Sequence, residues 1–231
     1  MSTTMYTQGD YLEKNPTWHV EDSPWKARQI MKMMSRNKIK SKTICEIGCG
    51  AGEILVQLQN SLDKDHGFWG YDISPQAIEL CKKRSNEGLQ FILGDLCEAD
   101  IFFDLVLIID VIEHVEDYFT FLRNIKEISK YKILHIPLDI SVQTLLLNRT
   151  FIEDRYSVGH IHVFTKEIAL MILRDAGYQV IDYFYTGIGF EGHGKSIASY
   201  FTRWPRKLLF AINKDLTVRI LGRYSLMVLA E

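Results

Sequence analysis

The sequence contains few cysteines, few prolines and no long hydrophobic run. Only four cysteines and five prolines occur among its 231 residues. None of the cysteines forms a Cys-x-x-Cys pair, so we expect free thiols in a reducing compartment rather than a disulfide framework. The first ten residues are polar and lack the apolar core of a secretory signal, and no apolar stretch reaches the ~20 residues that cross a bilayer. These absences predict a cytoplasmic protein.

The sequence also lacks an excess of either charge sign. Its 27 basic and 29 acidic residues give a net charge of −2, so no overall field attracts nucleic acid and no nucleic-acid partner is expected. The charge is uneven, however, because residues 203–223 carry six basic residues against the single acidic Asp215. The length fits one domain with a modest insertion. Nothing in the sequence indicates an oligomeric state.

Apolar runs and helix-like segments alternate along the chain. Strands are predicted at 42–46, 68–72, 89–93, 103–109, 131–136, 178–185 and 224–230, the fifth being stopped by Pro137. Helices are predicted at 25–37, from 51, from 75, at 115–129 and at 166–176, and 138–164 is expected to be loop-rich. This alternation is typical of an α/β protein with a Rossmann-like, doubly wound sheet of seven strands.

The pattern divides the chain into four parts. Residues 1–38 form an arm and a first helix, 39–186 form the core, and 224–231 form the final core strand. Between the last two strands, residues 187–223 open with four glycines and then become apolar and basic. We expect this insertion to form a helical cap.

A glycine-rich turn marks a candidate cofactor site. Glu46-Ile47-Gly48-Cys49-Gly50-Ala51-Gly52 closes the first predicted strand and opens a helix. Gly48 and Gly50 let the backbone turn tightly and approach a ligand, which then meets the free N–H groups of the helix. Ligands of open α/β sheets bind at such strand ends.

Two cofactors are compatible with the turn alone. The dinucleotide fingerprint Gly-x-Gly-x-x-Gly places its third glycine where this chain has Glu53, and the glycine falls one residue earlier, at Gly52. That shift argues against NAD. Glu46 suits a cationic amino-acid group better than a pyrophosphate. Asp72 follows the second strand, where a carboxylate can accept hydrogen bonds from both ribose hydroxyls.

Five segments resemble, in order, the successive motifs of class I S-adenosylmethionine (SAM)-dependent methyltransferases. They are Glu46–Gly52, Tyr71–Pro75, Gly94–Leu96, Phe103–Asp104 and Asp110–His114. The resemblance covers roughly residues 40–137 and is specific as a set. It implies a SAM-binding core whose seventh strand is antiparallel and inserted beside the sixth, with S-adenosylhomocysteine as the cofactor product.

The resemblance also implies roles for residues of the cofactor site. Asp72 would bind the ribose, and Asp95 would bind the adenine amino group, with Leu96 donating from its backbone. Ile73 would pack on the adenine, and the turn from Gly48 to Gly50 would hold the methionine end. The predicted cofactor-binding residues are Glu46, Gly48, Cys49, Gly50, Asp72, Ile73, Asp95, Leu96 and Asp110.

Asp110, Glu113 and His114 follow the fourth predicted strand and form a candidate catalytic group. If a helix begins there, positions i, i+3 and i+4 share one face, which would point toward the transferable methyl. His114 would then act as a general base toward a substrate hydroxyl, for which an unperturbed pKa of about 6.5 is suitable. Alternatively, the two carboxylates and the imidazole would hold a divalent cation that polarises the accepting oxygen.

His160, in Gly159-His160-Ile161-His162-Val163-Phe164-Thr165, bears on the metal alternative. The small-RNA 2′-O-methyltransferases have an acidic-x-x-Glu-His box and a later histidine five residues before Ser or Thr, which together bind Mg²⁺. Asp110, Glu113, His114 and His160 are similar in type and order. This chain, however, has Asp where that family has Glu, and it lacks the basic or aromatic surface that RNA requires. A metal is therefore not favoured, and Glu113, His114 and His160 are predicted as catalytic residues. His135 and His162 are expected to be hydrogen-bonded core or loop residues.

The acceptor is indicated only as a class. The sequence favours transfer to oxygen of a small-molecule, glycan-like or lipid-linked acceptor, and a non-catalytic SAM- or nucleotide-binding module is the alternative. Trp18, His19 and Trp25 either line the substrate cavity or hold the first helix against the sheet. Residues 200–223 either touch a membrane surface as a basic amphipathic helix or pack their apolar stripe on the domain.

Overall fold

The computed structural model describes residues 2–63, 65–96, 101–147, 149–187 and 197–231. Seven strands form one sheet in the order β3-β2-β1-β4-β5-β7-β6. They are β1 (Thr43–Ile47), β2 (Gly67–Asp72), β3 (Leu89–Leu93), β4 (Phe103–Ile109), β5 (Ser129–Leu138), β6 (Val180–Thr186) and β7 (Tyr224–Ala230). The first five pair in parallel, and β7 lies antiparallel between β5 and β6. The predicted Rossmann-like fold with an antiparallel last strand is confirmed.

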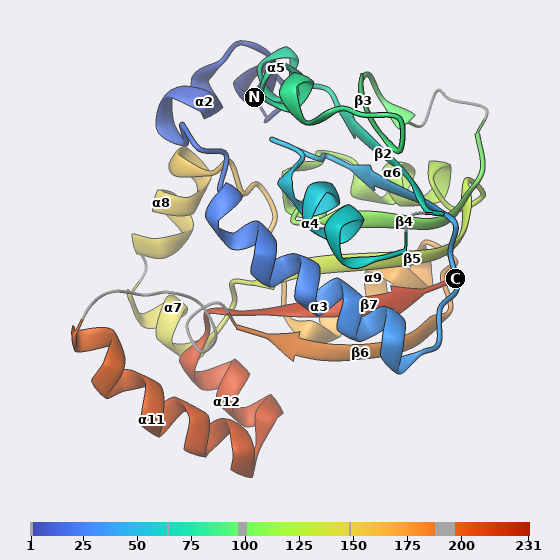
Figure 1. The fold of residues 1–231 in the computed structure, drawn as a ribbon. Coiled ribbons are helices and arrows are strands. Elements are labelled where there is room, and N and C mark those ends of the chain that lie inside the picture. Colours follow the sequence, from blue (N-terminus) through green and yellow to red (C-terminus); the bar gives the residue numbers. More distant parts are fainter. Residues whose placement is uncertain (1, 64, 97–100, 148, 188–196) are drawn as a thin grey trace.

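Helices cover both faces of this sheet (Figure 1). One face carries α3 (Ser23–Arg36) and α4 (Glu53–Ser61), and the other carries α6 (Tyr118–Asn124) and α9 (Lys166–Asp175). The other described helices are α1 (Ser2–Thr7), α2 (Asp10–Lys14), η1 (Val20–Asp22), α5 (Pro75–Cys81), η2 (Lys82–Arg84), η4 (Ile112–His114), α7 (Val142–Leu147), α8 (Arg149–Ser157), α11 (Ile197–Ile212) and α12 (Lys214–Leu221).

Two hydrophobic clusters, one on each face of the sheet, form the core. Residues of β4 alternate between them: Leu105, Leu107 and Ile109 pack with α3 and α4, whereas Val106 and Ile108 pack with α6 and α9. Successive side chains of a strand point to opposite faces. Because β4 is apolar from Leu105 to Ile109, this stretch is buried on both faces, as a central parallel strand should be.

Three local expectations are wrong. The segment 138–164, expected to be loop-rich, contains α7 and α8. These helices expose apolar side chains such as Leu145 and Leu146, so no amphipathic period marks them. The helix expected over 115–129 is the shorter α6, because β5 begins at Ser129. β5 continues through Pro137. Its pairing with β4 ends at His135, so the absence of an N–H group on the proline costs no hydrogen bond to β4.

The insertion 187–223 is helical where it is described. α12 contacts both α11 and α7, and the three helices lie together at one end of the molecule (Figure 1). Phe210 stacks on Tyr224 of β7 with ring centroids 5.2 Å apart, which fastens α11 to the sheet. Gly189, Gly192 and Gly194, which mark the start of the insertion in the sequence, lie outside the described residues. Among the helices of the described ranges, none has the length and apolar character needed to cross a bilayer.

Candidate functional site

The glycine turn lies at the carboxyl end of β1, and its backbone requires glycine. Gly48, Gly50 and Gly52 have φ angles of 68°, 54° and 76°, in the left-handed region that other residues rarely adopt. A Cβ at Gly48 would lie 2.8 Å from Cγ2 of Val111. The N–H groups of Gly48 and Cys49 donate to the carbonyl of Tyr71, which holds the turn against β2.

Asp72, at the end of β2, ties this turn to the start of α5. Its Oδ2 accepts from the N–H of Gly50 at 2.9 Å, and its Oδ1 accepts from the N–H of Ser74 at 2.8 Å. Burial raises the pKa of Asp72 to about 6, although these N–H groups oppose the rise. Each carboxylate oxygen keeps a further lone pair. The ribose-binding role of Asp72 is therefore compatible with this geometry and stays a prediction.

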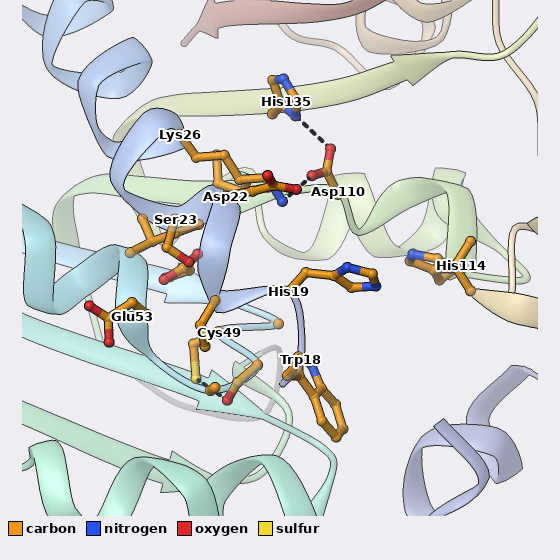
Figure 2. Close-up of a pocket in the computed structure, with 18 of the residues that line it drawn as sticks. Trp18, His19, Asp22, Ser23, Lys26, Cys49, Glu53, Asp110, His114 and His135 are labelled. Atoms are coloured by element: carbon orange, nitrogen blue, oxygen red, sulfur yellow. Dashed lines mark hydrogen bonds and ion pairs between the residues drawn. The ribbon is translucent and has the colours of Figure 1, made fainter. Parts of the chain in front are cut away.

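Two cavities open at this edge of the sheet and share part of their walls. One, of about 350 Å³, is lined by the residues predicted to hold adenosine, Asp72, Ile73, Asp95 and Leu96. The other, of about 280 Å³, is shown in Figure 2. It is lined by Glu46, Cys49, Gly50, Glu113, His114 and His160. Gly48, Asp110 and His114 border both cavities. The fold thus brings every predicted site residue to one region.

Glu46 presents an unpaired carboxyl oxygen beside the 280 Å³ cavity. Its side chain is buried, and Oε2 has no hydrogen-bond partner. Burial raises the pKa of Glu46 well above its usual range, and Lys26 opposes the rise. A cationic ligand group beside Glu46 would favour the ionised carboxylate. This is the environment that the sequence predicts for the amino-acid end of the cofactor.

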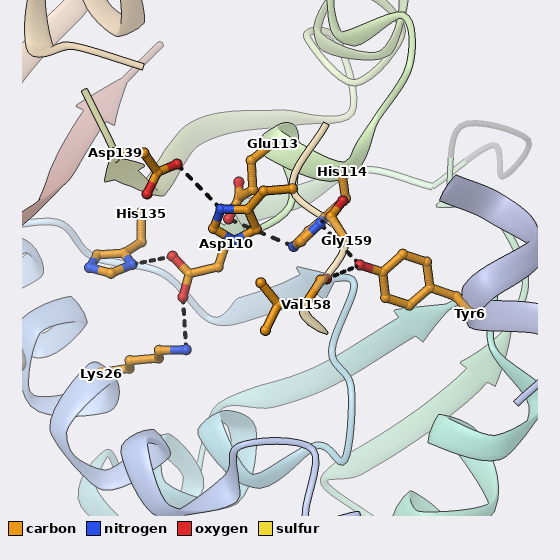
Figure 3. A network of polar contacts seen from close by, with 10 residues as sticks. Tyr6, Lys26, Asp110, Glu113, His114, His135, Asp139, Val158 and Gly159 are labelled. Atoms are coloured by element: carbon orange, nitrogen blue, oxygen red, sulfur yellow. Dashed lines mark hydrogen bonds and ion pairs between the residues drawn. The ribbon is translucent and has the colours of Figure 1, made fainter. Parts of the chain in front are cut away.

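Asp110 belongs to a buried polar network and does not start a helical face. Its φ is 55°, and the residues that follow form the 3₁₀ turn η4. The prediction that Asp110, Glu113 and His114 share one face of an α-helix is therefore wrong. Oδ2 of Asp110 lies 2.7 Å from Nζ of Lys26, and Oδ1 lies 2.5 Å from Nδ1 of His135 (Figure 3). Burial opposes ionisation, but His135 and Lys26 hold the pKa of Asp110 below its usual range. His135 is thus a hydrogen-bonded core residue, as expected.

Glu113, His114 and His160 gather into a second polar group. One potential ligand atom from each lies within 4.8 Å of the others. Glu113 is fully buried, and neither of its carboxyl oxygens has a hydrogen-bond partner. Burial, followed by the charge of Asp110, raises its pKa well above the usual range. The metal-binding set considered from the sequence is therefore only partly assembled, because Asp110 binds Lys26 and His135 instead.

The loop after α8 brings His160 to this group from far along the sequence. The N–H groups of Ile161 and His162 donate to the carbonyl of Glu113 at 2.9 and 3.1 Å. Nδ1 of His114 lies 3.1 Å from the carbonyl of Gly159, and the two imidazole centroids of His114 and His160 are 5.0 Å apart. Backbone hydrogen bonds thus fix the relative position of the two histidines.

The N-terminal arm covers the junction between the two cavities. Tyr11 and Trp18 border both cavities, and their rings are 4.7 Å apart. Tyr6 packs on Tyr11 with centroids 4.9 Å apart. The Tyr6 hydroxyl donates to the carbonyl of Val158 at 2.8 Å and lies 3.0 Å from Nδ1 of His114. The arm therefore contacts both the cofactor edge and the candidate catalytic group.

The structure separates the three arm residues singled out in the sequence. Trp18 and His19 line the 280 Å³ cavity, whereas Trp25 is buried in α3 with its ring 5.9 Å from that of His135. Sequence reasoning missed Lys26 and Tyr6. The only local indication that Lys26 belongs to the site is its position beside apolar residues of a helix that packs on the sheet. No local pattern indicates a role for Tyr6.

The seven-stranded fold, the glycine turn and the acidic residues at successive strand ends define a class I SAM-dependent methyltransferase. Residues 21–183 match the family model described as a methyltransferase domain, and the chain belongs to that family.

Individual relatives are more distant. The mitochondrial ubiquinone biosynthesis O-methyltransferase of Schizosaccharomyces pombe is 34% identical over 103 residues, which are 40% of this chain. The match spans only 35% of that curated relative. Magnesium protoporphyrin IX methyltransferase from Synechocystis PCC 6803 with bound SAM has a TM-score of 0.62 at 12% identity, over 100% of this chain and 96% of that chain. The plantazolicin methyltransferase BpumL in complex with a monoazolic desmethylPZN analogue and S-adenosylhomocysteine has a TM-score of 0.61 at 16% identity, over 99% of this chain and 92% of that chain. At these identities the two structures show the fold alone.

Proposed function

We propose that the protein transfers the methyl group of SAM to a hydroxyl oxygen of a small-molecule, glycan-like or lipid-linked acceptor. One observation carries this proposal: the cavity that contains Glu46 and the glycine turn also contains Glu113, His114 and His160. The methionine end of the cofactor and an acceptor beside the imidazoles would share one enclosure. Holding two reactants in one geometry is a large part of what such an enzyme must do.

The cofactor would extend across both cavities. Its adenosine would occupy the 350 Å³ cavity against Ile73, with Asp72 on the ribose, and its methionine end would lie at Gly50 beside Glu46. SAM supplies a methyl group that is already activated on a sulfonium. The residues of the protein would align the acceptor oxygen with that methyl and exclude water.

Oxygen is favoured as the acceptor atom because imidazoles line the cavity. A hydroxyl must lose its proton as it is methylated, and a neutral imidazole can accept it. Burial lowers the pKa of His114 to about 4, so this side chain is neutral near pH 7. The similarity to a relative named as an O-methyltransferase agrees with this choice over the matched 103 residues.

The alternative, a non-catalytic SAM- or nucleotide-binding module, accounts less well for Glu113. A fully buried carboxyl group whose oxygens have no hydrogen-bond partner costs folding free energy. Such a cost is expected where the group serves a reaction or an absent ligand.

Calorimetric titration with SAM, S-adenosylhomocysteine and NAD tests the cofactor assignment. We expect the first two to bind and NAD not to bind. Asp72→Asn should weaken SAM binding, whereas Asp175→Asn, the same change at an exposed position of α9, should not. Tight binding of NAD alone would contradict the proposal.

A radiolabelled methyl-transfer screen over phenols, sugars, amines and lipids tests the reaction. We expect label to appear on a hydroxyl acceptor. SAM binding without transfer to any acceptor class would favour the non-catalytic module, and transfer only to amines would correct the acceptor atom.

We also propose that the protein is cytoplasmic and that it touches anionic membranes through residues 200–223 together with α7. Within the described side chains, Leu208, Ile212 and Leu146 are exposed apolar residues, and the nearby basic residues Lys207 and Lys214 are also exposed. Apolar side chains flanked by basic ones suit an anionic lipid surface. The buried free thiols Cys45, Cys49 and Cys81 support a reducing compartment.

Co-sedimentation with phosphatidylglycerol vesicles tests this contact. Leu208→Glu with Ile212→Glu should reduce the bound fraction, and Met171→Glu, at an exposed apolar position on α9, should not. Absence of wild-type binding to these vesicles would remove the membrane proposal and leave the methyl-transfer proposal intact.

A further inference from the structure

Two imidazoles line the cavity in which an acceptor hydroxyl would lie, and they differ in their partners. His114 and His160 both border the 280 Å³ cavity, with ring centroids 5.0 Å apart. Their hydrogen bonds decide which ring nitrogen carries a proton and which keeps a lone pair. The two imidazoles therefore differ in their capacity to accept a proton.

His114 is held as a neutral imidazole of low basicity. Its Nδ1 lies 3.1 Å from the carbonyl oxygen of Gly159, and a carbonyl only accepts, so Nδ1 carries the proton. Its Nε2 lies 3.8 Å from Oε1 of Glu113. Burial, together with a smaller effect of His160, lowers the pKa of His114 to about 4, although the carbonyl of Gly159 opposes the decrease. A proton arriving on His114 would thus be poorly stabilised.

His160 has the opposite arrangement. Its Nδ1 lies 3.3 Å from Oδ2 of Asp139, which follows β5. A carboxylate accepts from Nδ1–H, so Nε2 keeps its lone pair, and no described residue forms a hydrogen bond with Nε2. The side chains of His160 and Asp139 are 15% and 17% exposed, so water screens their interaction only in part.

Charges from three elements act on His160. Burial lowers its pKa, but Asp139 beyond β5, Asp154 on α8 and Asp110 beyond β4 together raise it above the usual value. Of these three carboxylates, only Asp139 forms a hydrogen bond with the ring, whereas Asp154 contributes by charge and through its backbone carbonyl, which accepts from the N–H of His160 at 3.4 Å. His114 and Glu113 complete the surroundings.

We propose that Nε2 of His160 is the atom that removes the acceptor proton, and that Asp139 is the residue that positions and charges this imidazole for the role. The proposal rests on the proposed methyl transfer to a hydroxyl. The acceptor oxygen would form a bond to the methyl carbon while the carbon–sulfur bond of SAM breaks and its electron pair stays on sulfur. The hydroxyl proton passes to Nε2, giving S-adenosylhomocysteine, the methyl ether and an imidazolium paired with Asp139. The imidazolium then releases its proton to solvent.

Histidine NMR of the complex with S-adenosylhomocysteine tests the pair without turnover. In the ¹⁵N-histidine-labelled protein, with signals assigned through His160→Gln and His114→Gln, we expect His160 to show an Nδ1–H tautomer and to titrate at higher pH than His114. Asp139→Asn should lower the pKa of His160. Asp154→Asn should leave its tautomer unchanged, because Asp154 makes no contact with the ring. A His160 titration that is indifferent to Asp139→Asn would overturn the proposal.

Turnover with catechol, or with the hydroxyl acceptor that the screen identifies, tests the catalytic role. His160→Gln should lower kcat by about 10²-fold or more, as loss of a general base does, with S-adenosylhomocysteine affinity retained. Asp139→Asn should lower the kcat plateau by about 10-fold and move the acidic limb of the pH profile to lower pH, because a weaker base is also deprotonated at lower pH. Asp139→Glu should restore part of both.

Four turnover results are decisive. A lower plateau with a shifted limb supports the pair, whereas a lower plateau with an unmoved limb would mean that Asp139 is only structural and would overturn it. Hydroxyl transfer that is insensitive to His160→Gln would also overturn it while leaving the proposed function standing. Absence of transfer to every hydroxyl acceptor would count against the proposed function itself.

Discussion

Replacing Lys26 by methionine removes one partner from the buried network around Asp110. Nζ of Lys26 lies 2.7 Å from Oδ2 of Asp110, and the two side chains are 14% and 26% exposed. Methionine keeps much of the aliphatic volume of lysine, so the packing of α3 should survive while the charge is lost. The carboxylate of Asp110 would then retain His135 as its side-chain hydrogen-bond partner.

The expected cost follows from this geometry. Removing one partner of a buried ion pair typically destabilises a protein by about 3–5 kcal/mol, because the other charge is left uncompensated. Since His135 still contacts Oδ1 of Asp110, we expect the lower end, about 3 kcal/mol. For a chain of this size, that corresponds to a decrease in Tm of roughly 6–12 °C.

Arg36→Met is a matched control on the same helix. Nε of Arg36 lies 2.8 Å from Oδ2 of Asp182, but the arginine side chain is 54% exposed, and exposed pairs contribute at most about 1 kcal/mol. Urea unfolding followed by circular dichroism measures both variants. If Lys26→Met costs no more than Arg36→Met, the reasoning about the buried network is refuted.

Three further predictions concern the cofactor edge and the arm. Gly50→Ala should weaken SAM binding by about 10-fold or more in calorimetry, because the φ of Gly50 is 54° and the added Cβ would lie 2.5 Å from Cδ1 of Trp18. The control variant Gly88→Ala changes a glycine with an ordinary φ and should bind SAM normally. Equal SAM affinities of the two variants would contradict the argument. The pKa of Asp72 is raised from 3.8 to about 6, so the folded apoprotein binds this proton more tightly than the unfolded chain does. The stabilising contribution of this proton is present below about pH 4 and is lost as the pH rises to about 6, and it amounts to at most about 3 kcal/mol. Asp72→Asn should flatten this part of the plot of unfolding free energy, measured with urea, against pH. An unchanged slope would disprove the assignment of the proton to Asp72. Tyr6→Phe removes the hydroxyl between Val158 and His114 and should speed hydrogen exchange in residues 2–22 by about 5-fold, the equivalent of one hydrogen bond of about 1 kcal/mol. Tyr183→Phe, at an exposed position of β6, should leave that exchange unchanged.

The contacts of the two histidines show why the site could be predicted only in part. The residue types at 110–114 and at 160 indicate proton transfer or metal binding, and their position beyond strands places them at the ligand-binding edge. Sequence alone makes His114 the more obvious base, because it lies in the motif. In the mechanism that we propose, the hydrogen bonds of Gly159 and Asp139 reverse that order, and neither contact has a local signature.

The sequence by itself determined the sheet and the cofactor edge. Strand β4 is apolar from Leu105 to Ile109, so this stretch had to be buried on both faces, and Gly48, Gly50 and Gly52 allow a turn that few other residues can adopt. These features depend on near neighbours along the chain, where the alternation of side chains and the allowed φ angles act directly. The position of the third glycine at residue 52 rather than 53, which argues against NAD, is likewise a local feature of one turn.

Only the tertiary structure decided how the polar groups pair. Lys26 with Asp110, Tyr6 with His114, and Asp139 with His160 are contacts between segments that the fold brings together from distant positions. Hydropathy patterns predict which face of an element is buried, but they do not state which charge will lie opposite on another element. Those pairings depend on ångström-scale distances set by packing, and they determine which groups in the cavity are charged and which can accept a proton.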